Sequence, residues 1–179
     1  MATTYKLIAK EVLTTTATTV TFNNIPATYT DLKIVISARG NRTGSASSNF
    51  MMKFNNVGSG GLYKKYVWEA DGGGSLAGYQ NNSDNSFQYM YIPASGNIAN
   101  NFNNAEIYIP SYADNKKKTF LAIVTQHSTE ATANGASIAQ QMYGQYTSND
   151  AITRIDFDEQ YGDSFVADSS FYLYGISNA

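Results

Sequence analysis

The side chains that most often carry catalysis are scarce in this chain of 179 residues. It contains no cysteine and a single histidine, His127. A cysteine–histidine nucleophile, a thiolate metal site and a site built from several histidines are therefore excluded. A serine hydrolase would need His127, yet no serine stands in the G-x-S-x-G frame of a nucleophile elbow. We therefore expect no enzyme, and we interpret His127 as a structural residue at the edge of a loop.

Carboxylate oxygens offer a second kind of chemistry, the binding of a hard cation. Asp156 and Asp158 are two positions apart, with Glu159 and Asp163 close behind. On a strand this spacing puts Asp156 and Asp158 on one face, and Ca²⁺ prefers oxygen ligands. The spacing does not match the EF-hand loop, however, and alternation alone also places both aspartates on a solvent face. We predict no metal and no other cofactor, and we keep Asp156, Asp158 and Asp163 as weak metal candidates.

Aromatic residues offer a third kind of chemistry, the recognition of neutral sugars. The region around Trp68 and Tyr79 also contains other tyrosines, namely Tyr63, Tyr66, Tyr89 and Tyr91. Aromatic platforms and asparagine side chains suit neutral sugars, so Trp68 and Tyr79 are candidate glycan contacts. The alternative is that these rings pack the core or cover a sheet face. Glu69 and Asp71 resemble the carboxylate pair of a glycosidase, an interpretation that we disfavour.

Charge and composition exclude several partners. The formal net charge is −2 and only 15% of residues are charged, so there is no basic field to attract nucleic acid or an anionic membrane. No apolar stretch approaches the roughly 20 residues of a membrane helix, and the N-terminus lacks a secretory layout. Lys116–Lys118 is expected to be the solvated tip of a turn. The glycines of Gly40–Gly44 and Gly72–Gly74 lack the Lys-Ser/Thr of a phosphate-binding loop.

The elements that must position these residues are β-strands. In Leu32–Arg39, apolar residues on one face alternate with mainly polar residues on the other, which is typical of a half-buried strand. This pattern recurs along the chain between loops rich in Asn, Ser and Gly. We predict an all-β fold: an antiparallel, jelly-roll-like sandwich of two sheets with about ten or eleven strands, formed by one domain over residues 1–179.

Individual segments allow sharper expectations. Tyr5–Leu13 and Val20–Phe22 should form a hairpin, because only a short threonine-rich linker separates them. Asp71–Asn85 is expected to be a long loop, because its glycine triplet cannot hold a strand cheaply. The nearly continuous apolar run Thr119–Gln126 indicates a central strand covered on both faces. A turn is expected at Asn55–Gly61 and a loop at His127–Gly135. Further strands are expected at Leu32–Arg39, Asn49–Phe54, Leu62–Ala70, Phe87–Ile92, Ala105–Ile109, Ala136–Tyr146, Ile152–Asp158 and Phe171–Ile176.

The N-terminal segment Ala2–Leu13 is the predicted docking or oligomer contact. Its adjacent apolar residues Leu7 and Ile8 do not fit a strand with a single apolar face. Contacts are expected from four side chains of this segment: Tyr5, Leu7, Ile8 and Val12.

Packing motifs at both ends of the chain resemble those of small virion structural proteins of tailed bacteriophages. Three motifs follow one another in the order seen in that group: Leu7–Ala9, then Val20–Phe22 with Ile25–Pro26, then Tyr29 with Asp31–Leu32. The ending FYLYGI, Phe171–Ile176, is similar to the aromatic final strand of the group. Because these are packing motifs, no functional residue carries over.

The resemblance implies a non-enzymatic protein of the virion surface, synthesised in the cytoplasm of a host bacterium. The expected partners are the major capsid protein or other virion proteins, and the analogy also implies a homo-trimer. The leading hypothesis is a capsid decoration, or knob, protein. The alternative is a tail-fibre or receptor-binding module that recognises a cell-surface glycan through Trp68 and Tyr79.

Overall fold

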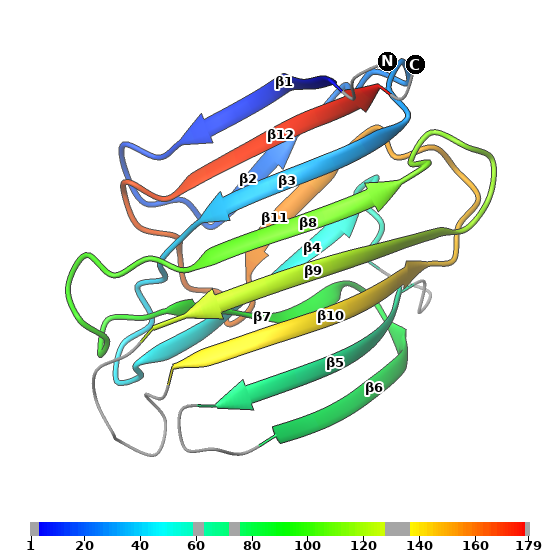
Figure 1. The fold of residues 1–179 in the computed structure, drawn as a ribbon. Coiled ribbons are helices and arrows are strands. Elements are labelled where there is room, and N and C mark those ends of the chain that lie inside the picture. Colours follow the sequence, from blue (N-terminus) through cyan, green and yellow to red (C-terminus); the bar gives the residue numbers. More distant parts are fainter. Residues whose placement is uncertain (1–3, 59–62, 72–75, 128–136, 178–179) are drawn as a thin grey trace.

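The computed structural model describes residues 4–58, 63–71, 76–127 and 137–177. Within these ranges the chain forms no helix. Its twelve strands build two antiparallel sheets that pack as a sandwich (Figure 1). The predicted fold class is therefore confirmed, with slightly more strands than expected. No helix long and apolar enough to cross a membrane occurs in the described part of the chain.

The two sheets differ in size. The larger has the order β1 (Thr4–Val12), β12 (Ser170–Ser177), β3 (Asp31–Ser37), β8 (Asn104–Pro110), β9 (Lys118–Gln126), β10 (Ile138–Tyr146), β5 (Tyr63–Asp71) and β6 (Leu76–Asp84). The smaller has the order β2 (Thr19–Phe22), β11 (Ile155–Glu159), β4 (Ser47–Phe54) and β7 (Phe87–Pro93), and in Figure 1 it lies behind the larger sheet. The chain crosses repeatedly between the layers, and β1 to β4 alternate between them. We call the face of the larger sheet that points away from the smaller one the outer face.

The core lies between the two sheets and follows the alternation of the strands. In β4, Phe50, Met52 and Phe54 are fully buried, whereas the intervening Met51 and Lys53 are partly exposed. The ring of Phe54 meets that of Phe120 from the opposite sheet, edge to face, with 5.5 Å between centroids. Burial of these large apolar side chains is the main force that holds the layers together.

The expected hairpin between the first two strands is wrong. β1 pairs with β12, from Thr4 opposite Ser177 to Val12 opposite Ser170. β2 pairs with β11 in the other sheet. The linker itself is held by the segment before β12, since the Leu13 amide donates to the Ser169 carbonyl and Ala17 bridges to Phe165. Because Leu13 and Val20 are both buried between the layers, the linker crosses from one sheet to the other.

The expected loop at Asp71–Asn85 is also wrong, because most of it forms β6. This strand pairs with β5 from Leu76 opposite Ala70 to Asp84 opposite Tyr63. It is the edge strand of the sheet, where a polar sequence can be tolerated because few of its side chains are buried. The glycine triplet Gly72–Gly74 lies outside the described residues. The same holds for the end of the turn at Asn55–Gly61 and for most of the loop at His127–Gly135.

The strand β9 is central in its sheet, but it is not covered on both faces. Phe120, Ala122 and Val124 are buried between the layers. Ile123 is exposed and Leu121 is partly exposed, on the outer face. The apolar run therefore places two apolar side chains in contact with solvent, where a strand of a sandwich usually carries polar ones.

A β-bulge explains the adjacent apolar residues of the first strand. The register of β1 against β12 shifts between Leu7 and Ala9. The extra residue, Ile8, is partly buried and packs against the core, whereas Leu7 is exposed. A bulge lets adjacent side chains of one strand point into different environments, here the core for Ile8 and solvent for Leu7.

Candidate functional site

Aromatic and apolar side chains gather on the outer face over β8, β9, β10 and β5. The strand register aligns Tyr108, Leu121, Tyr143 and Tyr66 as successive partners across these four strands. A second row of partners contains Ile123, Gln141 and Trp68, followed by Gly78 on β6. Since Trp68 is 64% exposed and Tyr66, Tyr143 and Tyr108 are also exposed, the two rows form an apolar surface that the fold itself leaves uncovered.

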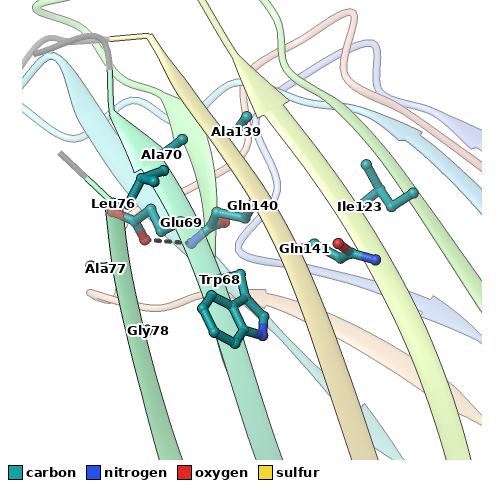
Figure 2. A pocket seen from close by; sticks show the side chains of 10 residues that line it. All are labelled: Trp68, Glu69, Ala70, Leu76, Ala77, Gly78, Ile123, Ala139, Gln140 and Gln141. Carbon is teal, nitrogen blue, oxygen red and sulfur yellow. Dashed lines mark hydrogen bonds between the residues drawn. The ribbon is translucent and has the colours of Figure 1, made fainter. Parts of the chain in front are cut away.

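Beside Trp68 this surface is hollowed. The hollow has a volume of about 460 Å³, and small residues, including Ala70, Ala139 and Gly78, leave room at its base (Figure 2). Larger side chains stand around it: Trp68 on β5, Ile123 on β9 and Leu76 on β6, which is 85% exposed. The indole plane of Trp68 thus stands next to an open space rather than inside the core. This arrangement can accommodate a small ring that has an apolar face.

The polar side chains that line the hollow are two amides, Gln140 and Gln141, and the carboxylate of Glu69. Gln141 lines the hollow from β10, and its Nε2 donates to the hydroxyl of Tyr143 at 2.9 Å. Gln80 lines a second hollow of about 270 Å³ on the other side of Trp68, together with Tyr66 and Gly78. Amides both donate and accept hydrogen bonds, so they can pair with hydroxyl groups of a ligand.

Directly behind the hollow, a polar network joins the two sheets. Gln140 Nε2 donates to Glu69 Oε2 at 3.0 Å and to the Tyr89 carbonyl at 2.9 Å (the first bond is drawn in Figure 2). Gln140 Oε1 accepts from the Tyr91 amide at 3.2 Å. The side chain of Gln140 therefore pairs with the backbone of β7, the edge strand of the smaller sheet, and holds that edge against β10.

The two candidate glycan contacts are on opposite faces of the sheet. Trp68 pairs with Gly78, so the next residue of β6, Tyr79, points to the other side. Burial, with a smaller effect of the nearby Glu69 carboxylate, raises the pKa of Tyr79. The phenol of Tyr79 thus stays protonated and can donate a hydrogen bond. Tyr79 does not line the 460 Å³ hollow, but together with Trp68 it lines the second hollow of about 270 Å³.

One carboxylate residue, Glu69, is among those that line the hollow. Glu69 is committed to Gln140 on the side of the sheet that faces β7. The side chain of Asp71 lies outside the described residues. His127 is exposed, and its Nδ1 lies 3.0 Å from Ser137 Oγ. The Glu69 carboxylate is therefore already engaged by the amide of Gln140.

The acidic residues of β11 are occupied by basic and hydroxyl partners. Asp156 forms an ion pair with Arg154 at 2.7 Å and accepts from Thr21 Oγ1. Asp158 forms an ion pair with Lys53 at 2.8 Å and accepts from Thr19 Oγ1. In the ranges that the structure describes, no group of three Asp, Glu, His or Cys side chains is placed to hold a metal ion. Asp163 lies after the strand, and its amide donates to Glu159 at 3.0 Å.

Two other charged residues, Glu159 and Lys118, are buried and hold backbone segments in place. Glu159 is buried and accepts hydrogen bonds from Ser48 Oγ and from the Tyr161 amide, which holds the end of β11. Lys118 is also buried, which corrects the expectation of a solvated tip for the whole of Lys116–Lys118. Its ammonium group donates to carbonyls of three residues, Asp114, Asn149 and Asp150. Only the first two lysines of that cluster are exposed.

Three of the four predicted docking residues share the outer face of β1. Tyr5, Leu7 and Val12 are exposed there, and the Tyr5 ring lies 6.0 Å from the ammonium of Lys33 on β3. Ile8 is separated from them by the bulge. β1 is the outermost strand of its sheet, opposite to the edge formed by β6. The predicted docking residues and the Trp68 hollow are therefore at opposite ends of one sheet.

Sequence reasoning missed four residues of the outer face, namely Ile123, Gln141, Tyr143 and Tyr108. The alternation of β10 was visible, but it does not reveal that a neighbouring strand places an isoleucine on the same exposed face. Cross-strand register, which the linear pattern does not contain, brings these residues together.

Comparisons with known proteins identify no family. No family model matches the chain, and no curated protein matches it. Among solved structures, the chain is similar to the exoplasmic/lumenal domain of VIP36 in its Ca²⁺/Man3GlcNAc-bound form, with 8% identity and a TM-score of 0.31 over 99% of this chain and 87% of that one.

Two viral structures give lower values. They are the structure of infectious bursal disease virus Gx strain, with 12% identity and a TM-score of 0.15, and the VP2 subviral particle of the same virus, with 11% and 0.11. Each similarity covers 98% of this chain but only 39% and 41% of those chains, respectively.

Proposed function

We propose that this chain is a non-enzymatic structural protein of a bacteriophage particle, a capsid decoration protein that docks on the major capsid protein. One observation carries the proposal. The two segments that resemble small virion proteins are far apart in the sequence, yet they form adjoining strands, because β12 pairs with β1 on one side and with β3 on the other. The resemblance thus covers β1, β12 and the start of β3 at one end of the larger sheet, together with Val20–Phe22, which forms β2 of the smaller sheet.

The outer face of β1 is the proposed docking surface. Tyr5, Leu7 and Val12 are apolar side chains held in solvent on an edge strand, where a partner protein would remove them from water. The two lysines of the strand, Lys6 and Lys10, are also exposed and protect the edge from pairing with further copies. Docking therefore uses side chains of the outer face rather than the open backbone of the strand.

The experiment is incorporation into particles. Leu7→Ser and Val12→Ser, combined in one chain, should lower the number of copies per particle severalfold, measured by quantitative mass spectrometry of purified virions. The matched control is Ile123→Ser, an exposed apolar residue of the same sheet far from β1, which should leave the copy number unchanged. Full incorporation of the double variant, with the protein located away from the capsid in a particle reconstruction, would overturn the assignment.

A second candidate function is recognition of a cell-surface glycan at the Trp68 hollow. The observation that favours it is the exposed indole beside a space of about 460 Å³ that has amides at its rim. Binding on a glycan array should be lost in Trp68→Ala. Because Trp68 is largely exposed, this substitution should leave the fold intact. Array signals that are the same for both proteins would eliminate the hollow as the site.

A further inference from the structure

We propose that the outer face of β8, β9, β10, β5 and β6 binds an extended, uncharged polysaccharide, with several successive sugar units laid across the strands. This inference rests on the second candidate function, glycan recognition, and deepens it from a single-sugar hollow to a chain-binding surface.

The length of the surface is the first argument. Besides the two hollows that flank Trp68, a third of about 170 Å³ lies where Tyr108, Leu121 and Tyr143 meet. From β5 to β8 the sheet spans three inter-strand spacings of ~4.8 Å, which is roughly 14 Å. That distance is longer than one pyranose ring. A ligand that contacts both Trp68 and Tyr108 must therefore have several units.

The pattern of groups along this surface is the second argument. Exposed rings stand on β8, β10 and β5, and each hollow adjoins at least one of them. Hydroxyl and amide side chains alternate with the rings: Thr119 lines the third hollow, Gln141 the first and Gln80 the second. A polysaccharide repeats apolar C–H faces and hydroxyl groups in the same alternation, whereas a protein partner favours one contiguous apolar centre.

The scarcity of charge is the third argument. Among the described outward-facing residues of β9, β10, β5 and β6, Lys64 is the one charged side chain. On β8, Glu106 is a second charged side chain of the surface and the register partner of Ile123, and Lys33 of the neighbouring β3 neutralises it at 2.8 Å. Nucleic acids and anionic polysaccharides need a cationic surface for affinity. This surface fits an uncharged chain instead.

The preorganisation of the aromatic row is the fourth argument. Tyr143 is held by Gln141 Nε2 at its hydroxyl, and its strand neighbours on both sides are Leu121 and Tyr66. The row is part of a sheet with hydrogen bonds on both sides of β10, so its rings are placed before any ligand arrives. Preorganised side chains lose less conformational entropy on binding.

The experiment uses Trp68, the sole tryptophan, as a fluorescent reporter in the full chain. Neutral gluco-, manno- and galacto-oligosaccharides of two and of six units are titrated, with polygalacturonate as a charged comparison. We expect at least one neutral hexasaccharide to shift the Trp68 emission and to bind at least about tenfold more tightly than its disaccharide. Tyr108→Ala should weaken hexasaccharide binding roughly tenfold and leave disaccharide binding unchanged. Tyr172→Ala, on β12 of the same sheet, is the matched control and should change neither.

The outcomes distinguish failure of the extended surface from failure of glycan recognition itself. Equal affinities for disaccharide and hexasaccharide, or an unchanged hexasaccharide affinity in Tyr108→Ala, would overturn the extended surface and leave a single-sugar site at Trp68. Tight binding of polygalacturonate that salt removes would overturn the uncharged class. If no neutral oligosaccharide of either length perturbs Trp68, glycan recognition and the extended surface both fail, while the docking role is still decided by the particle experiment.

Discussion

Gly144 of β10 and Phe120 of β9 are register partners, and the phenyl ring occupies the space in which a side chain on Gly144 would lie. A Cβ atom built on Gly144 would come within 2.1 Å of the ring. The same ring meets Phe54 and Phe87 of the smaller sheet, at centroid distances of 5.5 and 4.7 Å. Phe120 can cross the space between the layers in this way only because its partner has no side chain.

Gly144→Ala should therefore destabilise the protein. The added methyl group forces the Phe120 ring out of its contacts, and overpacking of this kind costs about 1–3 kcal/mol. Urea denaturation followed by circular dichroism measures the change. Gly78→Ala is the control, since its Cβ would lie 3.6 Å or more from any neighbour, and a similar loss in both variants would contradict this explanation.

Gln140→Leu should loosen the contact between β7 and the larger sheet. The substitution removes the partners of the Tyr89 carbonyl and the Tyr91 amide, and each part-buried hydrogen bond of this kind contributes about 0.5–1.5 kcal/mol. Tyr89 also has a φ of 70°, in the left-handed region, so the bond to Gln140 helps to hold a strained residue. Hydrogen exchange should show faster exchange of the Tyr91 amide. Gln141→Leu, one residue further on and on the outer face, should change stability by less than about 0.5 kcal/mol.

Tyr63 should make the protein sensitive to alkali. Its hydroxyl is buried beside the Phe54 amide, and burial raises the pKa of this phenol far above its usual value of 10.0. Below pH 10 both the folded and the unfolded state keep the proton. Above pH 10 only the unfolded state releases it, so the free energy of unfolding falls by about 1.4 kcal/mol per pH unit from this one group. Tyr63→Phe should lack this part of the slope between pH 10 and 12, and parallel curves for the two proteins would refute the assignment.

Calcium should have no effect on stability. Asp156 and Asp158 are already paired with Arg154 and Lys53, so a cation would have to displace a bound side chain from each carboxylate. Melting temperatures in millimolar CaCl₂ and in EDTA should agree within about 1 °C. A cation that binds only the folded state would instead raise the melting temperature with its concentration.

Alternation along single strands was the part of the fold that the sequence predicted well. In the strand predicted at Asn49–Phe54, the apolar residues Phe50, Met52 and Phe54 occupy alternate positions, and they are fully buried together. This works because each residue of a strand is assigned to a face by its own position, without reference to other strands. The two-sheet arrangement follows from many such half-buried strands.

Pairing between strands could not be predicted in the same way. The linker before Val20 looks like a turn, but it crosses between layers because Leu13 is buried and its backbone pairs with Ser169. The polar sequence of β6 conceals a strand, since an edge position does not demand apolar residues. The apolar run Thr119–Gln126 predicts burial of Ile123, because nothing in the run indicates that one face of the strand is open to solvent.

The sequence identifies only part of the candidate site, because residue type can be read from the sequence but pairing between strands cannot. Trp68 was singled out by its residue type, and it does stand beside a hollow. Tyr79 was grouped with it by proximity in the sequence, although the register of β5 and β6 turns the two rings to opposite faces. Gln140 could not be identified in this way. It alternates with the apolar residues Ile138 and Met142, and nothing in the sequence indicates that its side chain pairs with the backbone of β7.

The position of β12 between β1 and β3 has a consequence for biosynthesis. Residues 170–177 are made after the other strands of both sheets, yet they fill the gap between two strands near the start of the chain. Until the ribosome releases them, β1 has no neighbour in its sheet and β3 lacks one of its two. The edge of the sandwich thus closes late, through contacts between residues far apart in the sequence, and such non-local closure is slow.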